Sequence, residues 1–417
     1  MSTVATDTQD DIDPGNESSL GAAFDDYKAR LRGGDLGSLP AVLGLIAIIA
    51  VFTVMKGQTF FSAFNFANLI SQGAMIIVLA MGLVFVLLLG EIDLSAGFAA
   101  GTCAAVLAVT LTQKQWPLAL ALLACIGTGV LIGLLIGLLV ARLGIPSFVV
   151  TLAMFLALQG LMLLIIGEGG TIAIRDDTVL ALQNKNLTPL AGWILYAVVV
   201  VGYALLTGLR MRRRRAAGLV AEASSVWLAK VLTLAVLYGL VTFFLNQERS
   251  RRPELTSIQG VPYIVPLILL LLVVLTFILS RTAFGRHVYA VGGNAEAARR
   301  AGINVKGIKI ACFIACSSLA AVAGILFASR DNSVSPSTGG STTLLYAVAA
   351  AVIGGTSLFG GRGKISDALL GGLVVAVIAN GLPLITSQAG IQFIVTGLVL
   401  LVAASVDALS RRRSVAT

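Results

Sequence analysis

The feature that most constrains this chain is a series of twelve apolar runs, each close to the length of a membrane-spanning helix. A spanning helix needs about 20 predominantly apolar residues. Such a segment is helical because bilayer hydrocarbon cannot hydrogen-bond an exposed backbone. The runs lie near residues 40–56, 67–90, 95–113, 116–141, 147–167, 188–209, 226–246, 262–280, 309–329, 343–360, 366–386 and 389–408.

Composition supports this interpretation. Hydrophobic residues make up 57% of the 417 residues and charged residues only 12%, whereas globular domains carry about 25% charged residues. These values exclude a soluble enzyme, and the long runs exclude a β-barrel, whose strands are alternations of about 10 residues. The predicted fold is an all-α polytopic integral membrane protein with about 10–12 transmembrane helices, because Gly354 and Gly355 interrupt one run.

The distribution of basic residues predicts the orientation. With twelve spans, 21 of the 29 Lys and Arg residues fall in segments on the same side as the N-terminus. The positive-inside rule therefore places both termini in the cytoplasm. Residues 1–39 are predicted to be a disordered cytoplasmic tail and 409–417 a second tail, with the transmembrane domain at 40–408. The run Arg212–Arg215 is expected to meet anionic lipid headgroups rather than nucleic acid.

One cytoplasmic loop, 281–309, is neither a flexible linker nor a charge run, and residues 294–301 within it are predicted to form a short helix. The signals are an N-cap, an acidic first turn, a basic last turn and a C-terminal glycine. They are supplied by Asn294, Glu296, Arg299 with Arg300, and Gly302. A capped helix on the cytoplasmic surface is typical of a docking element.

Glu91 and Asp93 are the only charged residues between Gly57 and Gln113. Charges within membrane segments are costly and face protein or water. Two interpretations remain open: a broken-helix hinge beside the transport path, or an interfacial turn that caps the next helix at Ser95. Gln72 and Asn380, polar residues within spans, are candidates for hydrogen bonds between helices or along the path.

The segments 90–97 and 354–361 resemble each other weakly, with glycine at both ends and leucine in the fifth position. Transporters often contain repeats whose helices break near the substrate path. Chance and the abundance of glycine explain the similarity about equally well.

The sequence predicts no metal site and no bound cofactor. The four cysteines lie in apolar runs and are expected to be buried thiols, and the single histidine, His287, cannot form a metal cluster. The nearest match to a phosphate-binding loop ends at Gly363-Lys364-Ile365 and lacks the required residues. ATP, if it drives this protein, must be held by a partner.

Three segments resemble one family. Gly90–Gly97 (GEIDLSAG) resembles the Gly-Gly-Ile-Asp-Leu-Ser-Val-Gly signature of bacterial monosaccharide ABC-importer permeases, the ribose, xylose and galactoside group. Residues 289–303 (YAVGGNAEAARRAGI) resemble the family's cytoplasmic coupling segment, and 354–361 (GGTSLFGG) resembles its late Gly-Gly-Thr-Ser-Leu signature. The chain departs from the family at Glu91, where glycine is usual. An additional hydrophobic pair near 188–246 is similar to the longer, xylose-transporting members.

The resemblance implies an ABC-importer permease fold with no catalysis of its own, in the bacterial cytoplasmic membrane. The implied partners are a second permease copy, an extracytoplasmic sugar-binding protein and a cytoplasmic ATPase that holds ATP and Mg. The substrate expected is xylose, with ribose, a galactoside or a nucleoside as alternatives; an ion-coupled transporter using Glu91 and Asp93 is a further alternative. The residues expected to couple to the ATPase are Gly293, Asn294, Glu296, Ala297, Ala298, Arg299, Arg300 and Gly302. The residues expected at the path or hinge are Glu91, Asp93, Ser95, Gln72, Asn380, Gly354 and Gly355.

Overall fold

The computed structural model describes residues 39–167, 169–219, 222–250, 252–398 and 401. The predicted tails therefore lie outside the described residues, except that Leu39 begins the first described helix.

Ten of the twelve apolar runs are long helices in the part of the chain that the structure describes, each apolar enough to cross a membrane. This confirms the predicted all-α polytopic fold. The helices are α2 (Leu39–Lys56), α3 (Ala63–Leu88), α4 (Ala96–Ala108) with its π-helical continuation η2 (Val109–Gln113), α5 (Leu118–Ala141), α6 (Ser147–Ile166), α8 (Pro189–Ala216), α9 (Ser224–Asn246), α10 (Ile264–Arg281), α13 (Val305–Asp331) and α15 (Ile365–Ile385).

The other two runs form shorter helices. The run predicted near 343–360 is α14 (Ser341–Gly354), which ends where Gly355 adopts a φ of 122°. This backbone conformation favours glycine and stops a helix. The last run contains a helix at Ala389–Leu398, and most of its remaining residues lie outside the described part.

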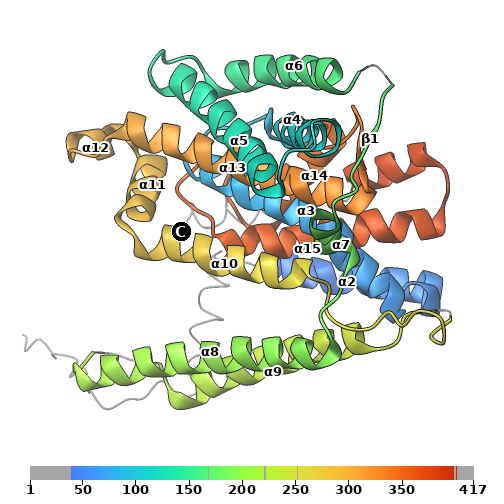
Figure 1. Ribbon diagram of the computed structural model, residues 1–417. Helices are drawn as coiled ribbons and strands as arrows, with labels where there is room; N and C mark the ends of the chain where they lie inside the picture. Colours follow the sequence, from blue (N-terminus) through green and yellow to red (C-terminus); the bar gives the residue numbers. More distant parts are fainter. Residues whose placement is uncertain (1–38, 168, 220–221, 251, 399–400, 402–417) are drawn as a thin grey trace, which may run out of the picture.

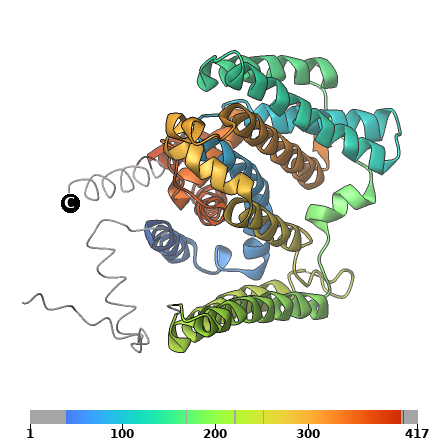
Figure 2. The same cartoon turned by 90° about the vertical axis from the view of Figure 1, so that its left-hand side faces the viewer.

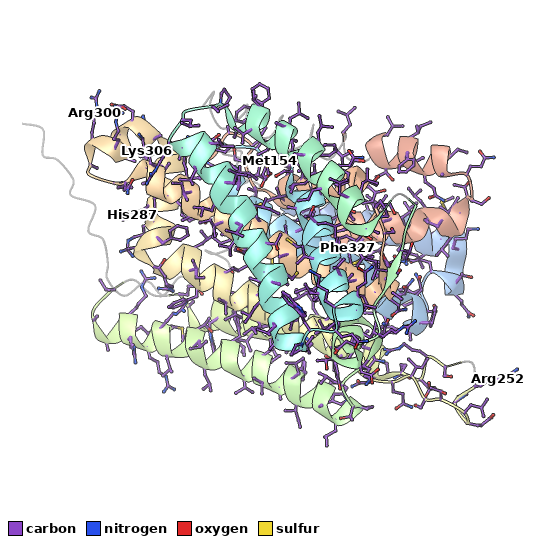
Figure 3. All side chains as sticks on the ribbon, turned by 45° about the horizontal axis from the view of Figure 1, so that its top comes forward. Met154, Arg252, His287, Arg300, Lys306 and Phe327 are labelled. Carbon is purple, nitrogen blue, oxygen red and sulfur yellow. The ribbon has the colours of Figure 1, made fainter. Side chains whose placement is uncertain are left out.

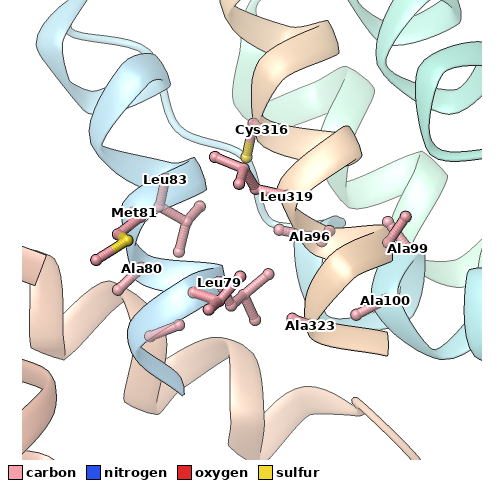
Figure 4. Packing of buried hydrophobic residues seen from close by; sticks show 14 of the residues in the cluster. Leu79, Ala80, Met81, Leu83, Ala96, Ala99, Ala100, Cys316, Leu319 and Ala323 are labelled. Atoms are coloured by element: carbon pink, nitrogen blue, oxygen red, sulfur yellow. The ribbon is translucent and has the colours of Figure 1, made fainter. Parts of the chain in front are cut away.

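Helix α3 lies at the centre of the bundle, and α13, α14 and α15 pack against it (Figure 1). Buried side chains of α3, α4 and α13 interlock there, including Leu79, Ala100 and Leu319 (Figure 4). Glycines permit the closest contacts. Gly129, Gly133 and Gly137, which are spaced at four-residue intervals and so share one face of α5, face α13, where a methyl group on each would lie 2.5–2.8 Å from backbone atoms.

The two ends of the bundle differ. At one end, β1 (Ile172–Ala173) pairs antiparallel with β2 (Ser333–Val334), with Ile172 opposite Val334, beside the short helix α7 (Asp177–Asn184). The other end, here called the α12 end, carries α11 (Ala283–Gly293) and α12 (Ala295–Arg300). These two helices lie at the left-hand side of Figure 1.

Helices α8 and α9 form a hairpin on one flank of the bundle, as Figures 1 and 2 show from two directions. They pack on each other, and α9 also contacts α3. Arg212–Arg215, which follow the apolar run 188–209 in the sequence, belong to the last turns of α8. Arginine is a good helix former, so the helix continues past the apolar run.

Candidate functional site

The predicted short helix exists as α12, and Asn294 caps it by accepting a hydrogen bond from the Ala297 N–H at 2.9 Å. Gly302 follows with a φ of 84°, as the C-terminal glycine signal predicted. The prediction that the rest of 281–309 is a loop is wrong. Helix α11 precedes α12, with the Thr282 hydroxyl capping it through the Gly285 N–H at 3.2 Å. A threonine three residues before that glycine was the signal that the sequence analysis missed.

Helix α12 presents its charged residues to solvent. Arg299 and Arg300 pair with Glu296 at 2.7 and 3.1 Å, yet their side chains are 70% and 79% exposed. Hydrogen bonds from Arg300 and then Arg299 lower the pKa of Glu296. Ala298 faces inward and is only 5% exposed. Figure 3 shows Arg300 and Lys306 at this end of the molecule and Arg252 at the other.

Helix α11 packs on the end of α3 at Gly292, where the two backbones are too close for a side chain. A methyl group there would lie 1.8 Å from the Leu88 carbonyl oxygen. The same carbonyl accepts a hydrogen bond from the Gly361 N–H at 2.9 Å. The Tyr289 hydroxyl donates to the Gly363 carbonyl at 2.7 Å. Helix α11 therefore joins the end of α3 to the loop that follows α14.

This contact brings the three segments of the family resemblance together. A methyl group on Gly360 would lie 2.8 Å from both the Gly292 carbonyl oxygen and the Gly90 nitrogen. The two segments with similar glycine spacing, 90–97 and 354–361, thus touch where their flanking helices break. No pattern in either segment indicates that the two lie close together.

The acidic turn between α3 and α4 places its second carboxylate inside the protein. Asp93 is fully buried, and one of its carboxylate oxygens accepts from the Ser95 N–H at 2.9 Å and the Ser95 hydroxyl at 2.6 Å. Ser95 occupies the N-cap position of α4 but makes no side-chain cap, so the prediction that Ser95 caps the helix is wrong. Its hydroxyl instead donates a hydrogen bond to the Asp93 carboxylate, and bonds to an ionised acceptor are strong.

Glu91 has a partner that the sequence analysis did not single out. Its carboxylate pairs with the ammonium of Lys309, in the second turn of α13, and the two side chains are only 16% and 24% exposed. The signal was an isolated acid within an apolar region, which requires a cation nearby. Lys309 is near α12 in sequence, so this pair connects the acidic turn to the base of the α11–α12 unit.

The loop after α14 is held by another residue that the sequence analysis missed. The Asp367 carboxylate accepts from the Lys364 N–H at 2.7 Å and the Thr356 hydroxyl at 3.3 Å. Asp367 stands at the third position of α15 and accepts from the N–H of the N-cap residue, which is one half of a capping box; because lysine cannot supply the other half, the residue pattern did not reveal it. Gly354 lies against this residue, since a methyl group on it would be 1.9 Å from the Asp367 carbonyl oxygen.

The polar residues predicted within spans join two helices. Asn380 on α15 donates to Gln72 on α3 at 3.1 Å and accepts from Asn65, also on α3, at 2.9 Å. Asn65 and Asn380 are buried. Such hydrogen bonds between spanning helices contribute about 0.6–2 kcal/mol each.

Within the described residues, no group of three His, Cys, Asp or Glu side chains is placed to hold a metal ion. The four cysteines are buried and unpaired, as predicted. The contacts connect the exposed charged helix α12, through α11, to two turns in the bundle: the one between α3 and α4 and the one after α14.

Comparison with known proteins identifies the family. The family model described as the branched-chain amino acid transport system / permease component matches residues 65–404. The chain is 37% identical to the xylose transport system permease protein of Escherichia coli K12, over 89% of this chain and 92% of that protein. It is 30% identical to the fructose import permease protein of Rhizobium meliloti, over 89% of this chain and 86% of that protein. The ribose import permease protein of E. coli K12 is also 30% identical, with 89% and 92% covered.

No solved structure matched the chain. The family match covers most of the sequence, and the relatives are permease components rather than enzymes. The chain therefore belongs to this family of ABC-importer permeases, as a multi-pass membrane subunit whose partner ATPase is a separate protein.

Proposed function

We propose that this chain is the permease of a xylose importer. The observation that carries the proposal is its 37% identity to the E. coli xylose permease, compared with 30% to the fructose and ribose permeases over similar lengths. The α8–α9 hairpin at 188–246 supports it, since a longer chain resembles the xylose-transporting members.

Helix α12 is the element that docks on the ATPase. It is exposed, capped at both ends and charged, and Ala298 fixes it to the bundle. Gly293, Asn294 and Gly302 form its ends, while Glu296, Ala297, Arg299 and Arg300 supply the surface that a groove of the ATPase would contact. ATP and Mg bind that partner and not this chain.

The turn at Glu91, Asp93 and Ser95 and the turn at Gly354 and Gly355 act together as a hinge. Their contact at Gly90 and Gly360, and the contact of both with α11, support this role. Movement of α12 would then shift α3, α4, α14 and α15 at the points where these helices end. Gln72 and Asn380 hold α3 to α15 during that movement rather than contacting sugar.

The α12 end faces the cytoplasm, with both termini on that side, since the arginine-rich last turns of α8 lie at the same end (Figure 1). A sugar-binding protein delivers substrate to the opposite end, and two copies of this chain form the membrane core.

The direct experiment is competition for uptake in cells that lack their own pentose transport. Cells that carry this chain with its ATPase and binding protein should accumulate labelled xylose, and excess xylose should suppress uptake at least tenfold more strongly than ribose or fructose. Preferential suppression by ribose or fructose would reassign the sugar. Uptake that continues after ATP depletion but stops with a protonophore would instead support an ion-coupled transporter.

A further inference from the structure

The α8–α9 hairpin is separated from the rest of the bundle by a cavity of about 540 Å³. One wall is α9, with Leu237, Val241 and Phe244. The opposite wall comes from α2, α3, α10 and α15. A cavity of this size is within the range of about 300–1,000 Å³ that holds small ligands.

The wall excludes a sugar as the occupant. Its polar side chains are Ser62, Asn65 and Tyr238. The first two are already engaged: the Ser62 hydroxyl accepts from the Asn65 N–H, and the Asn65 amide donates to Phe60 and Asn380. The Tyr238 hydroxyl has no hydrogen-bond partner among the described residues, but this one group cannot satisfy the several hydroxyl groups of a sugar, and unsatisfied polar groups are costly to bury. The remaining lining is aliphatic or aromatic, which favours hydrocarbon.

The cavity is open to the surface that faces the bilayer. Leu237 and Phe61 both line it, and they are 60% and 57% exposed. The outer faces of the hairpin are equally apolar, with Leu232 and Val236 more than half exposed. In a helix that spans a membrane, these side chains contact lipid, so the cavity is continuous with lipid hydrocarbon.

Aromatic contacts between α9 and the start of α3 form part of the wall of this cavity. The Phe244 ring of α9 lies 5.5 Å from Phe61 and 6.1 Å from Phe66, centroid to centroid, and all three rings line the cavity. Across the cavity itself the lining has no dispersion partners unless something fills it, because an empty space offers none. Water is a poor filler, because a buried water makes about three hydrogen bonds and the Tyr238 hydroxyl is the one polar group of the lining without a partner among the described residues.

We infer that this cavity is a binding site for an acyl chain of a membrane phospholipid, which completes the packing of the α8–α9 hairpin against the transport core. The lipid is a resident component of the protein. This inference does not depend on which sugar is transported.

The test compares the same substitution in three places. Val241 lines the cavity from α9 and Val265 from α10, whereas Val236 on α9 is 59% exposed and does not line it. Tryptophan at position 241 or 265 fills the cavity, and Val236→Trp is the matched control. Each protein is purified, washed extensively with detergent, and its retained phospholipid is measured by mass spectrometry per mole of protein.

The wild type and Val236→Trp should retain about the same phospholipid, and Val241→Trp and Val265→Trp should each lose at least half of it. Thermal unfolding provides the second measurement. Delipidated wild-type protein should unfold at a lower temperature and recover when phospholipid vesicles are added, whereas the two cavity-filled variants should respond less. Equal retention in all four proteins, or unfolding of the wild type that is unaffected by lipid, would overturn the assignment. Detergent in place of phospholipid in the washed wild type would also contradict it. Sugar uptake is not a readout here, so failure of this inference and failure of the proposed function are distinguishable.

Discussion

Lys309 on α13 neutralises Glu91 in the turn between α3 and α4, joining residues 218 positions apart in the sequence. The pair is largely buried, and it lies between the exposed α12 and the break in the central helices. Removal of either side chain leaves the charge of the other unpaired where water reaches it poorly, which lowers the free energy of unfolding by about 1–3 kcal/mol or more.

We therefore expect Lys309→Glu and Glu91→Lys each to lower uptake and the apparent unfolding temperature, and the double exchange Glu91→Lys with Lys309→Glu to restore much of both. The coupling between the two sites is measured as a double-mutant cycle. Independent, additive losses would show that the pair does not connect the two segments.

The contact of α11 with α3 predicts opposite results at two adjacent glycines. Gly292→Ala places a methyl group 1.8 Å from the Leu88 carbonyl oxygen, whereas a methyl group added at Gly293 would meet no atom within 4 Å. The first variant should lose about 1–3 kcal/mol of stability through overpacking and lose most uptake. Gly293→Ala, the matched control for packing, should unfold at the wild-type temperature. Similar unfolding temperatures for the two variants would contradict the contact.

Asn380 is the centre of the hydrogen bonds between α15 and α3. Asn380→Ala should lower stability by about 1–3 kcal/mol, because Asn65 and Gln72 lose their partner in a buried place. Gln388→Ala, at an exposed position beyond α15, serves as the control. Thermal unfolding in lipid nanodiscs measures the difference. If Asn380→Ala loses no more stability than Gln388→Ala, Asn380 does not join the two helices.

Glu248 organises the loop between α9 and α10 and gives a dependence on pH. Its carboxylate accepts hydrogen bonds from the Ser257 hydroxyl and from the Ile258 and Ser250 N–H groups, and these bonds lower its pKa to about 2. Because the folded pKa lies below the ordinary value of 4.5, the ordering is complete above that value and is lost as pH falls from it toward 2.

A fluorophore on Leu255→Cys can report this ordering, since the four native cysteines are buried. Its mobility should rise between pH 4.5 and 2, and Glu248→Gln should show the mobile state already at neutral pH. Glu254→Gln in the same loop should not. A label whose mobility is the same for Glu248→Gln and the wild type would refute the role of this carboxylate.

Local patterns predicted the helices well because apolar length and capping residues act over short distances. Asn294 and Gly302 marked the ends of α12, and the four-residue spacing of Gly129, Gly133 and Gly137 puts them on one helix face. Of the twelve apolar runs, ten are long helices in the described part of the chain.

Contacts between distant segments were not predictable from one sequence. Nothing near Glu91 indicates that Lys309 is its partner, and nothing in 354–361 indicates that it meets 90–97. The two hydrogen bonds from Ser95 to the Asp93 carboxylate depend on a backbone turn whose shape no residue pattern specified. On α9, Phe244 contacts Phe61, which precedes α3, and Phe66 in the first turns of α3, and no pattern in the sequence indicated these contacts.

The central claim is that α12 transmits the energy of a partner ATPase to this permease, and two proline variants test it. Ala298 donates its N–H to Asn294 at 3.0 Å within the helix, so Ala298→Pro removes a bond and breaks the helix. Ala295 is the first helical residue after the N-cap, where proline is tolerated, so Ala295→Pro is the matched control.

The measurement is xylose uptake into liposomes loaded with ATP and reconstituted with this chain, its ATPase and its binding protein. Wild type and Ala295→Pro should transport at rates within about twofold, and Ala298→Pro should fall by about tenfold or more while remaining in the membrane. Uptake by Ala298→Pro at the wild-type rate, or wild-type uptake in liposomes without ATP, would contradict the account.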